Sequence, residues 1–323
     1  MFMQDQIAHL ELETAESQWL RLHRNENLFL EKAWLTELGK ETISSLNLAQ
    51  YPDSDCRLLR ERLGQLYGID EDRIFIGNGS DEILAILLHY LREYFSEAVT
   101  PAITYRVYPL LLQRYDYTQL ALEKASKDRL CLIDSPNSLT GEISRVFEIP
   151  SAFLIWDNVY GEISNMQLDL KRMSPNTVIV RSFSKFYGLA SLRIGYCFAS
   201  REIVQALMNR KDIFNVNGFA QAMALRVLEH KQVFDSLIPK IYQARHALEA
   251  GLRSLGFLLS NSHTNCVWMT HPFVSAEVLQ RNLEEFYVMV RRFSEPGLCS
   301  YLRITVPPLE KVEYLLDLIR RCL

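Results

Sequence analysis

Short apolar runs alternate with helical segments between about residues 55 and 220, and this alternation constrains the fold of the chain most strongly. Each run is short and apolar throughout, as in a strand that is buried on both faces. The pattern predicts two helices, Glu82–Tyr94 and Arg201–Asn209. It predicts strands over Ile74–Gly77, Leu130–Asp134, Phe153–Asp157, Val178–Ser182 and Ile194–Ala199. Such alternation indicates an α/β fold in which helices sandwich a mostly parallel sheet.

The pattern changes after residue 221. We expect a long amphipathic helix from Ala222 to about Leu252, then a group of strands and a last helix. These are Cys266–Thr270, Tyr287–Arg291, Tyr301–Val306 and the helix Glu310–Cys322. The length of 323 residues suits one large domain and a smaller one. We therefore predict a large domain over residues 40–221 and a smaller α+β domain made of residues 1–39 and 222–323.

Composition limits the kinds of partner that we expect. The net charge of -4 shows no basic excess, so nucleic acid is not an expected partner. No apolar run reaches the roughly 18 residues that a membrane span needs. The first residues, MFMQDQIAHLELETAES, lack the cationic start and apolar stretch of a secretory signal. Together these features favour a cytoplasmic protein.

The cysteines have no spacing that suggests a metal site or a disulfide framework. Six are scattered along the chain: Cys56, Cys131, Cys197, Cys266, Cys299 and Cys322. We expect reduced, buried thiols and no bound metal. Cys299 lies close to a candidate substrate-binding arginine, and for this residue we favour a place in the core over a role as a nucleophile.

Polar residues follow four of the predicted strands at the point where each strand ends. These stretches are Gly77–Asp81, Asp134–Gly141, Asp157–Tyr160 and Ser182–Lys185. In an open parallel sheet, ligands bind beyond the carboxyl ends of the strands. We therefore expect the four stretches to meet at one site.

The stretch SFSKFYGLASLRIG indicates the chemistry of that site. Lys185 lies between Ser182 and Ser184, and Arg193 follows eight positions after the lysine. A lysine amine can form a Schiff base with a carbonyl, and hydroxyls with a guanidinium can hold a phosphate dianion. Pyridoxal 5'-phosphate requires both. The alternative is a serine-rich surface turn that happens to carry one lysine and one arginine.

The stretch GNGSDEIL joins a predicted strand to a predicted helix. Gly79, Ser80 and Asp81 place free backbone amides at the helix N-terminus, where an anion is favoured. The alternative is an ordinary turn in which Ser80 or Asn78 caps the helix. Because two acidic residues follow Ser80, a phosphate here would need the positive charge of Arg193.

Three further stretches offer groups for a flat ring. Asp157 ends an apolar strand, where a carboxylate needs a cationic partner such as a pyridinium nitrogen; capping a loop is its other possible role. Tyr160 and Asn137 could reach the ring hydroxyl. Tyr105 in TYRVY could stack on the ring, although a tyrosine at this position is also compatible with the core.

Read in chain order, the spacing of these stretches resembles that of fold-type I pyridoxal-phosphate aminotransferases of class I/II. Within that group it is most similar to the histidinol-phosphate aminotransferases. The resemblance extends from Asn25 to Val306. It is carried by NEN, YPD with LRERL, GNGSDEIL, TYRVY, SPNSLTG, DNVYGE, RSFSKFYGLASLRIGY, FNVNGFAQAMAL and LRITV.

The resemblance implies an aspartate-aminotransferase-like fold and a cytoplasmic enzyme of histidine biosynthesis, acting on histidinol phosphate with 2-oxoglutarate. Three alternatives stay open. One is an aminotransferase for another amino acid, aromatic or other. A second is a pyridoxal-phosphate decarboxylase of a phosphorylated amino acid such as threonine phosphate. The third is a non-catalytic protein that keeps the fold.

The resemblance also implies a role for each matching residue. Lys185 would be catalytic, bonding to the cofactor and moving the substrate proton, and Arg303 and Arg291 would bind substrate together with Asn137 and Asn27. Tyr51 would reach the cofactor phosphate of a neighbouring subunit, which implies a homodimer with shared sites. The other implied cofactor contacts are Asp157 at the ring nitrogen, Asn137 and Tyr160 at the ring hydroxyl, Tyr105 against the ring, and Gly79, Ser80, Asp81, Ser182, Ser184 and Arg193 around the phosphate.

The chain departs from the family pattern at a few positions. In SPNSLTG, the residues Ser135, Ser138 and Leu139 replace Asn, Asn and Pro. Ile103 replaces the proline before TY, and Pro307 replaces the glycine after LRITV. The N-terminal segment lacks a tyrosine that helps to hold the substrate phosphate in the resembled branch. These departures bear on the substrate more than on the cofactor.

Overall fold

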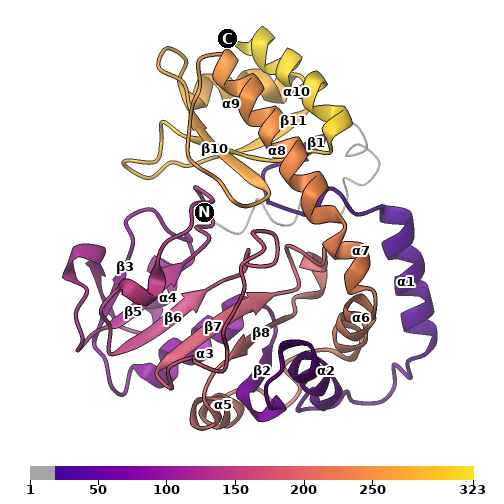
Figure 1. The fold of residues 1–323 in the computed structure, drawn as a ribbon, viewed down its shortest axis with the longest axis vertical. Helices are drawn as coiled ribbons and strands as arrows, with labels where there is room; N and C mark the ends of the chain where they lie inside the picture. Colours follow the sequence, from indigo (N-terminus) through magenta and orange to yellow (C-terminus); the bar gives the residue numbers. More distant parts are fainter. Residues whose placement is uncertain (1–18) are drawn as a thin grey trace.

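The protein, here a computed structural model, is described over residues 19–323 and contains two β-sheets (Figure 1). The N-terminal stretch that we expect not to be a secretory signal lies outside the described residues. The larger sheet has seven strands in the order β2-β8-β7-β6-β5-β3-β4. They are β2 (Ile74–Gly77), β3 (Glu97–Thr100), β4 (Thr118–Ala121), β5 (Leu130–Asp134), β6 (Phe153–Asp157), β7 (Thr177–Ser182) and β8 (Gly195–Phe198).

Within this sheet only β8 is antiparallel to its neighbours, β2 and β7. The other pairings, from β4 through β3, β5 and β6 to β7, are parallel. The predicted α/β fold with a mostly parallel sheet is therefore confirmed. All five strands predicted for this region are present, whereas β3 and β4 were not predicted.

The smaller sheet has five strands in the order β1-β11-β12-β10-β9. They are β1 (Leu20–Leu22), β9 (Leu258–Leu259), β10 (Cys266–Thr270), β11 (Val288–Arg292) and β12 (Leu302–Thr305). The short strand β1 pairs in parallel with β11, and Leu20 faces Val288 in the register. The N-terminal segment thus completes a sheet that is otherwise built by the C-terminal part of the chain.

Ten α-helices surround the two sheets in the described part of the chain. They are α1 (Lys32–Ser44), α2 (Arg57–Tyr67), α3 (Ser80–Leu91), α4 (Tyr108–Arg114), α5 (Arg201–Met208), α6 (Gly218–Glu229), α7 (Lys231–Asp235), α8 (Leu237–Ser254), α9 (Ala276–Glu285) and α10 (Leu309–Cys322). Figure 1 shows that α6, α7 and α8 follow one another along one side of the molecule, from the larger sheet to the smaller one.

The prediction of a single long helix from Ala222 to about Leu252 is wrong. The segment forms α6, α7 and α8, with breaks at His230 and Ser236. Pro239 in the first turn of α8 accounts for the second break. Proline lacks an N–H donor, and its ring clashes with the carbonyl four residues earlier. That carbonyl belongs to Asp235, the last residue of α7.

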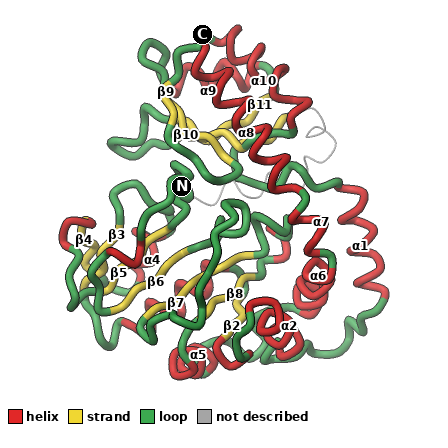
Figure 2. Tube along the Cα trace, viewed as in Figure 1, coloured by secondary structure: helices red, strands yellow, loops and turns green. Residues whose placement is uncertain are grey.

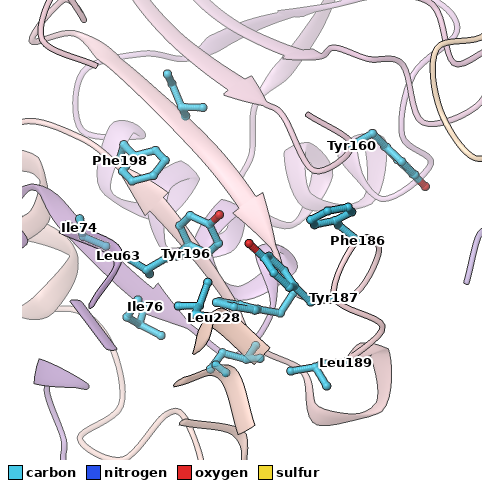
Figure 3. Packing of buried hydrophobic residues seen from close by; sticks show 14 of the residues in the cluster. Leu63, Ile74, Ile76, Tyr160, Phe186, Tyr187, Leu189, Tyr196, Phe198 and Leu228 are labelled. Carbon is cyan, nitrogen blue, oxygen red and sulfur yellow. The ribbon is translucent and has the colours of Figure 1, made fainter. Parts of the chain in front are cut away.

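Successive strand residues point to opposite sides of the larger sheet, and apart from the exposed edge strand β4 its strands are largely buried on both faces. In β2, Ile74 and Ile76 join a cluster with residues of α2 and α6, whereas Phe75 joins a second cluster with residues of α3 and α5. Figure 3 shows part of the first cluster, in which the rings of Phe186 and Tyr187 lie next to each other, with their centroids 5.0 Å apart. The expected sandwich of helices around the sheet is therefore present.

Loops occupy most of the space between the two sheets, at the carboxyl ends of the parallel strands (Figure 2). None of the helices formed by residues 19–323 has the length and apolar character that crossing a bilayer requires. Five of the six cysteines are buried, but Cys299 is exposed, so its assignment to the core is wrong. It lies in the turn between β11 and β12, outside any packed element.

Candidate active site

A cavity of about 430 Å³ lies between the two sheets and collects most of the predicted site residues. It is lined by loops that follow β2, β3, β5, β6 and β7 and by side chains of β11 and β12. The predicted residues that line it are Ser80, Asp81, Tyr105, Asp157, Tyr160, Ser182, Ser184, Lys185, Arg193, Arg291 and Arg303. Gly79, Asn27, Tyr51 and Asn137 do not line it.

Lys185 sits in the loop after β7, between residues that are anchored in the core. The side chains of Phe183, Phe186 and Tyr187 are all buried, and they hold the loop against the core. The Lys185 amine lines the cavity and donates a hydrogen bond of 2.9 Å to the carbonyl of Arg24. Burial, followed by the charge of Arg303, lowers the pKa of Lys185 to about 8. Roughly a tenth of the amine is therefore neutral and nucleophilic at pH 7, far more than for an ordinary lysine.

Asp157 lies at the end of β6 and is 5% exposed. Its Oδ2 accepts a 2.9 Å hydrogen bond from the Tyr108 hydroxyl, and its Oδ1 accepts one of 3.3 Å from the backbone N–H of Val159. The second bond is the loop-capping role that we considered. Both donors are uncharged, and burial raises the pKa of Asp157 to about 7. A protonated ring nitrogen fits such a site, because it would supply the cation that a buried carboxylate needs.

The N-terminus of α3 faces the cavity without a side-chain cap. Its N-cap residue is Gly79, at a φ of 82°, so neither Ser80 nor Asn78 caps the helix as the alternative interpretation required. A Cβ on Gly79 would lie 2.7 Å from Nη2 of Arg193, so the glycine lets the guanidinium approach the helix end. Free amides beside a guanidinium can hold a phosphate.

The acidic residues of this loop do not exclude a phosphate. Asp81 pairs with Arg193 at 3.0 Å and accepts a 3.1 Å hydrogen bond from the Tyr105 hydroxyl. The carboxylate of Glu82 accepts hydrogen bonds from Asn78 and Asn215 instead and does not line the cavity. The Ser184 hydroxyl is buried without a hydrogen-bond partner among the described residues, as expected of a group that a bound phosphate would satisfy.

The structure does not support the predicted ring-hydroxyl contact of Asn137. The amide nitrogen of Asn137 donates to the carbonyl of Ile103 and to Asp134, while its oxygen accepts from the backbone of the following turn. The next residue, Ser138, lines the cavity, and its hydroxyl is buried without a partner among residues 19–323. Sequence spacing cannot tell which of two neighbouring turn residues faces a ligand.

Asn27 also differs from its predicted role in substrate binding. Its amide donates a 2.7 Å hydrogen bond to the carbonyl of Phe186 and accepts from the backbone of Phe29, so it joins the N-terminal segment to the lysine loop. The neighbouring Asn25 contacts a residue that lines the cavity. It is fully buried and donates to the Tyr160 hydroxyl at 3.0 Å.

Arg303 and Arg291 project from the smaller sheet, where they face each other in the register of β11 and β12. Arg303 donates to the carbonyls of Ser138 and His23, at 2.8 and 3.0 Å, and its Nε is buried without a partner within residues 19–323. The guanidinium of Arg291 lies over the ring of Phe293, 5.5 Å from its centre. Both guanidinium groups line the cavity, as predicted.

Several lining residues were not predicted. Arg24 precedes the NEN motif, and Arg106 follows Tyr105 and pairs with Glu295 at 2.7 Å, so that the pair joins the two sides of the cavity. Asp134 ends β5 just as Asp157 ends β6. The stretch Asp134–Gly141 was expected at the site, but a role was assigned to the terminal acidic residue of the strand only for Asp157.

Comparison with known proteins shows the family. The family described as "Aminotransferase class I and II" matches residues 118–319, which is more than half of the chain. Histidinol-phosphate aminotransferases of Microcystis aeruginosa and Oceanobacillus iheyensis are each 30% identical to this chain. The first alignment covers 93% of this chain and 91% of the relative, and the second covers 92% and 90%.

Solved structures show the same fold at lower identity. The histidinol-phosphate aminotransferase of Sinorhizobium meliloti, in complex with pyridoxal-5'-phosphate, is 19% identical, with a TM-score of 0.84 over 97% of this chain and 94% of that one. L-threonine-O-3-phosphate decarboxylase of Porphyromonas gingivalis is 21% identical, with a TM-score of 0.83 over 94% and 98%. The chain belongs to the class I and II aminotransferases, which are pyridoxal-phosphate-dependent enzymes.

Proposed function

We propose that this protein transfers an amino group from histidinol phosphate to 2-oxoglutarate, as a step of histidine biosynthesis in the cytoplasm. The observation that carries the proposal is the cavity itself, in which Lys185 and Asp157 of the larger sheet lie opposite Arg291 and Arg303 of the smaller one. The name shared by the relatives at 30% identity supports this substrate.

The described residues divide the work of holding cofactor and substrate. Lys185 would hold the cofactor aldehyde, Asp157 the ring nitrogen, and the α3 N-terminus with Ser184 and Arg193 the phosphate. When bound, pyridoxal 5'-phosphate supplies an aldehyde that takes the amino group and a ring that draws electrons from the substrate carbon. The neutral amine of Lys185 then accepts the proton of that carbon and later returns it.

The arginines would recognise the anionic ends of the two substrates. Arg303 would bind the α-carboxylate of glutamate with two parallel hydrogen bonds, which a lysine could not copy. Histidinol phosphate has no α-carboxylate, so its phosphate would use the same group of charges, with Arg291 as the main partner. Partial burial, followed by the charge of Arg303, lowers the pKa of Arg291, so an anion between the two arginines is favoured.

The first test is substrate choice. We expect kcat/KM for histidinol phosphate to exceed the values for histidinol, phenylalanine and threonine phosphate, each measured with 2-oxoglutarate. Release of carbon dioxide from threonine phosphate would indicate a decarboxylase instead. Equal values for histidinol phosphate and histidinol would contradict a phosphate-binding pocket.

Arg291 offers a sharper test of the same pocket. Arg291→Ala should lower kcat/KM for histidinol phosphate by about tenfold or more, because a hydrogen bond to a charged group is worth roughly 1.5–3 kcal/mol. The loss for glutamate should be equal or smaller. Arg292→Ala is the matched control, since Arg292 donates to Gln280 and does not line the cavity. If both variants have equal and small effects, Arg291 does not contact the substrate.

We also propose that the enzyme is a homodimer in which Tyr51 completes the partner's site. Tyr51 is 82% exposed and lies outside the cavity of its own chain, stacked on Phe214 at 4.6 Å. Leu48 and Ile213 nearby are 71% and 70% exposed. Such an exposed apolar patch is typical of a surface that a second subunit covers.

Mixing two inactive variants tests the shared site. Lys185→Ala and Tyr51→Ala chains, unfolded and refolded together in equal amounts, should regain about a quarter of the wild-type activity. Random pairing places half of the chains in heterodimers, and each heterodimer has one complete site. Each variant refolded alone is the control. An active monomer in sedimentation, or a mixture as inactive as its components, would contradict the proposal.

A further inference from the structure

A second buried carboxylate lies directly beside Asp157. Asp134 ends β5, Asp157 ends the adjacent β6, and the two are partners in the register of the parallel pair. They are 3% and 5% exposed, and both line the cavity. Two carboxylates this close in a protein interior repel each other. Two such carboxylates are tolerated where hydrogen-bond donors or a positive charge offset their repulsion.

Asp134 binds donors from two loops that form walls of the cavity. Its Oδ1 accepts hydrogen bonds from the Thr104 hydroxyl at 2.7 Å and from Nδ2 of Asn137 at 3.2 Å. Its Oδ2 accepts from the backbone N–H of Ser138 at 2.8 Å. Thr104 precedes Tyr105, so Asp134 connects the loop of the predicted ring-stacking tyrosine to the turn of residues 135–138.

The surroundings of Asp134 are short of positive charge. Its three donors are neutral. Asp157 faces it from β6, and Tyr108 of α4 gives its hydroxyl to Asp157. Asp81, Tyr105 and Tyr160 are the other acidic and phenolic groups of the cavity, and His23 lines it as well. The cations of the cavity are Lys185, Arg193, Arg291, Arg303, Arg24 and Arg106. The groups that donate hydrogen bonds to the two carboxylates are all neutral, so a protonated ring nitrogen would supply the positive charge that these donors lack.

We propose that Asp134 is a positioning residue for the cofactor: it fixes the Tyr105 loop and the 135–138 turn, and its charge would reinforce that of Asp157 at the ring nitrogen. The inference rests on the proposed placement of Asp157 at the ring nitrogen. Burial, and next the charge of Asp134, raise the pKa of Asp157 to about 7. The carboxylate pair therefore favours a nearby proton, and a protonated ring nitrogen bonded to Asp157 would offset part of the negative charge of both carboxylates.

The test is a pH titration of the holoenzyme's visible absorption. Asp134→Asn keeps an oxygen acceptor and removes the charge. We expect the pKa of the absorption change to fall by about one unit, since a nearby charge acts on this scale at intermediate dielectric constant. We also expect the Kd for pyridoxal 5'-phosphate to rise several-fold. Thr104→Val removes one donor but keeps the charge, so it should weaken cofactor binding and leave the titration unchanged.

Two comparison variants show whether a negative result overturns this inference alone or also the placement of Asp157. Asp128→Asn replaces an exposed aspartate and should change neither property. Asp157→Asn should shift the same titration; if it does not, the placement of Asp157 at the ring nitrogen fails, and this inference with it. If Asp157→Asn shifts the titration and Asp134→Asn does not, Asp134 only caps its turn and the inference alone is overturned. Should Asp134→Asn not fold, Asp134→Ser keeps a small acceptor without charge and replaces it.

Discussion

Replacing Lys185 with alanine is expected to lower kcat by roughly 10⁴-fold or more, because the substitution removes both the covalent attachment of the cofactor and the group that moves the substrate proton. The purified variant should lose the visible absorption of the wild-type holoenzyme. Borohydride reduction followed by peptide mapping should find the cofactor on Lys185 in the wild type and on no lysine of the variant. Lys171→Ala, at an exposed lysine outside the cavity, is the control.

The low pKa of Lys185 gives this prediction a second measurement. Only the neutral amine attacks an aldehyde, and the pKa of Lys185 is about 8. The rate at which the cofactor-free protein takes up pyridoxal 5'-phosphate should therefore rise as the pH increases through about 8 and level off above it. A rate that keeps rising towards the ordinary lysine pKa, or a reducible adduct at another lysine in Lys185→Ala, would contradict the assignment.

The second large effect is expected at Asp157. Asp157→Asn should bind the cofactor but lower the rate of proton removal from the substrate by roughly 10²–10³-fold, since a preorganised charge at the reacting centre is worth about this much. The amide oxygen can still accept the Tyr108 hydrogen bond, so the local structure should be retained. Single-turnover rates and exchange of the substrate proton measure the step directly.

A conservative variant separates the two roles of this aspartate. Asp157→Glu keeps the charge and should be milder than Asp157→Asn. If Asp157→Asn works at nearly the wild-type rate, the only remaining role of the residue is the turn that its Oδ1 holds at Val159.

The strands of the larger sheet could be predicted because burial on both faces makes them continuous apolar runs. Phe153–Asp157 and Leu130–Asp134 were predicted with their correct bounds for this reason. The strand β4 is largely exposed, and β1 has only three residues, so neither carries such a signal. The pairing of β1 with β11 depends on contacts distant in sequence, which local patterns do not contain.

The site was predicted best where the spacing of residues sets their position. Lys185 and Arg193 belong to one continuous stretch between β7 and β8, and both line the cavity as expected. Asn137 was predicted less well, because its orientation depends on Asp134 and on the carbonyl of Ile103, which lies in another loop. The break between α7 and α8 was visible in the sequence as Pro239, and the helical periodicity around it was given too much weight.

The pairing of β1 with β11 has a consequence for the order in which the protein is completed during synthesis. The larger sheet uses only residues 74–198, so all its strands have left the ribosome well before β11 and β12 are made. The smaller sheet cannot form before residues 288–305 are synthesised, and β1 has no partner strand until then. Domains fold as units while the chain emerges. The nascent chain can thus present Lys185 and Asp157 on a finished sheet before the arginines that select the substrate exist.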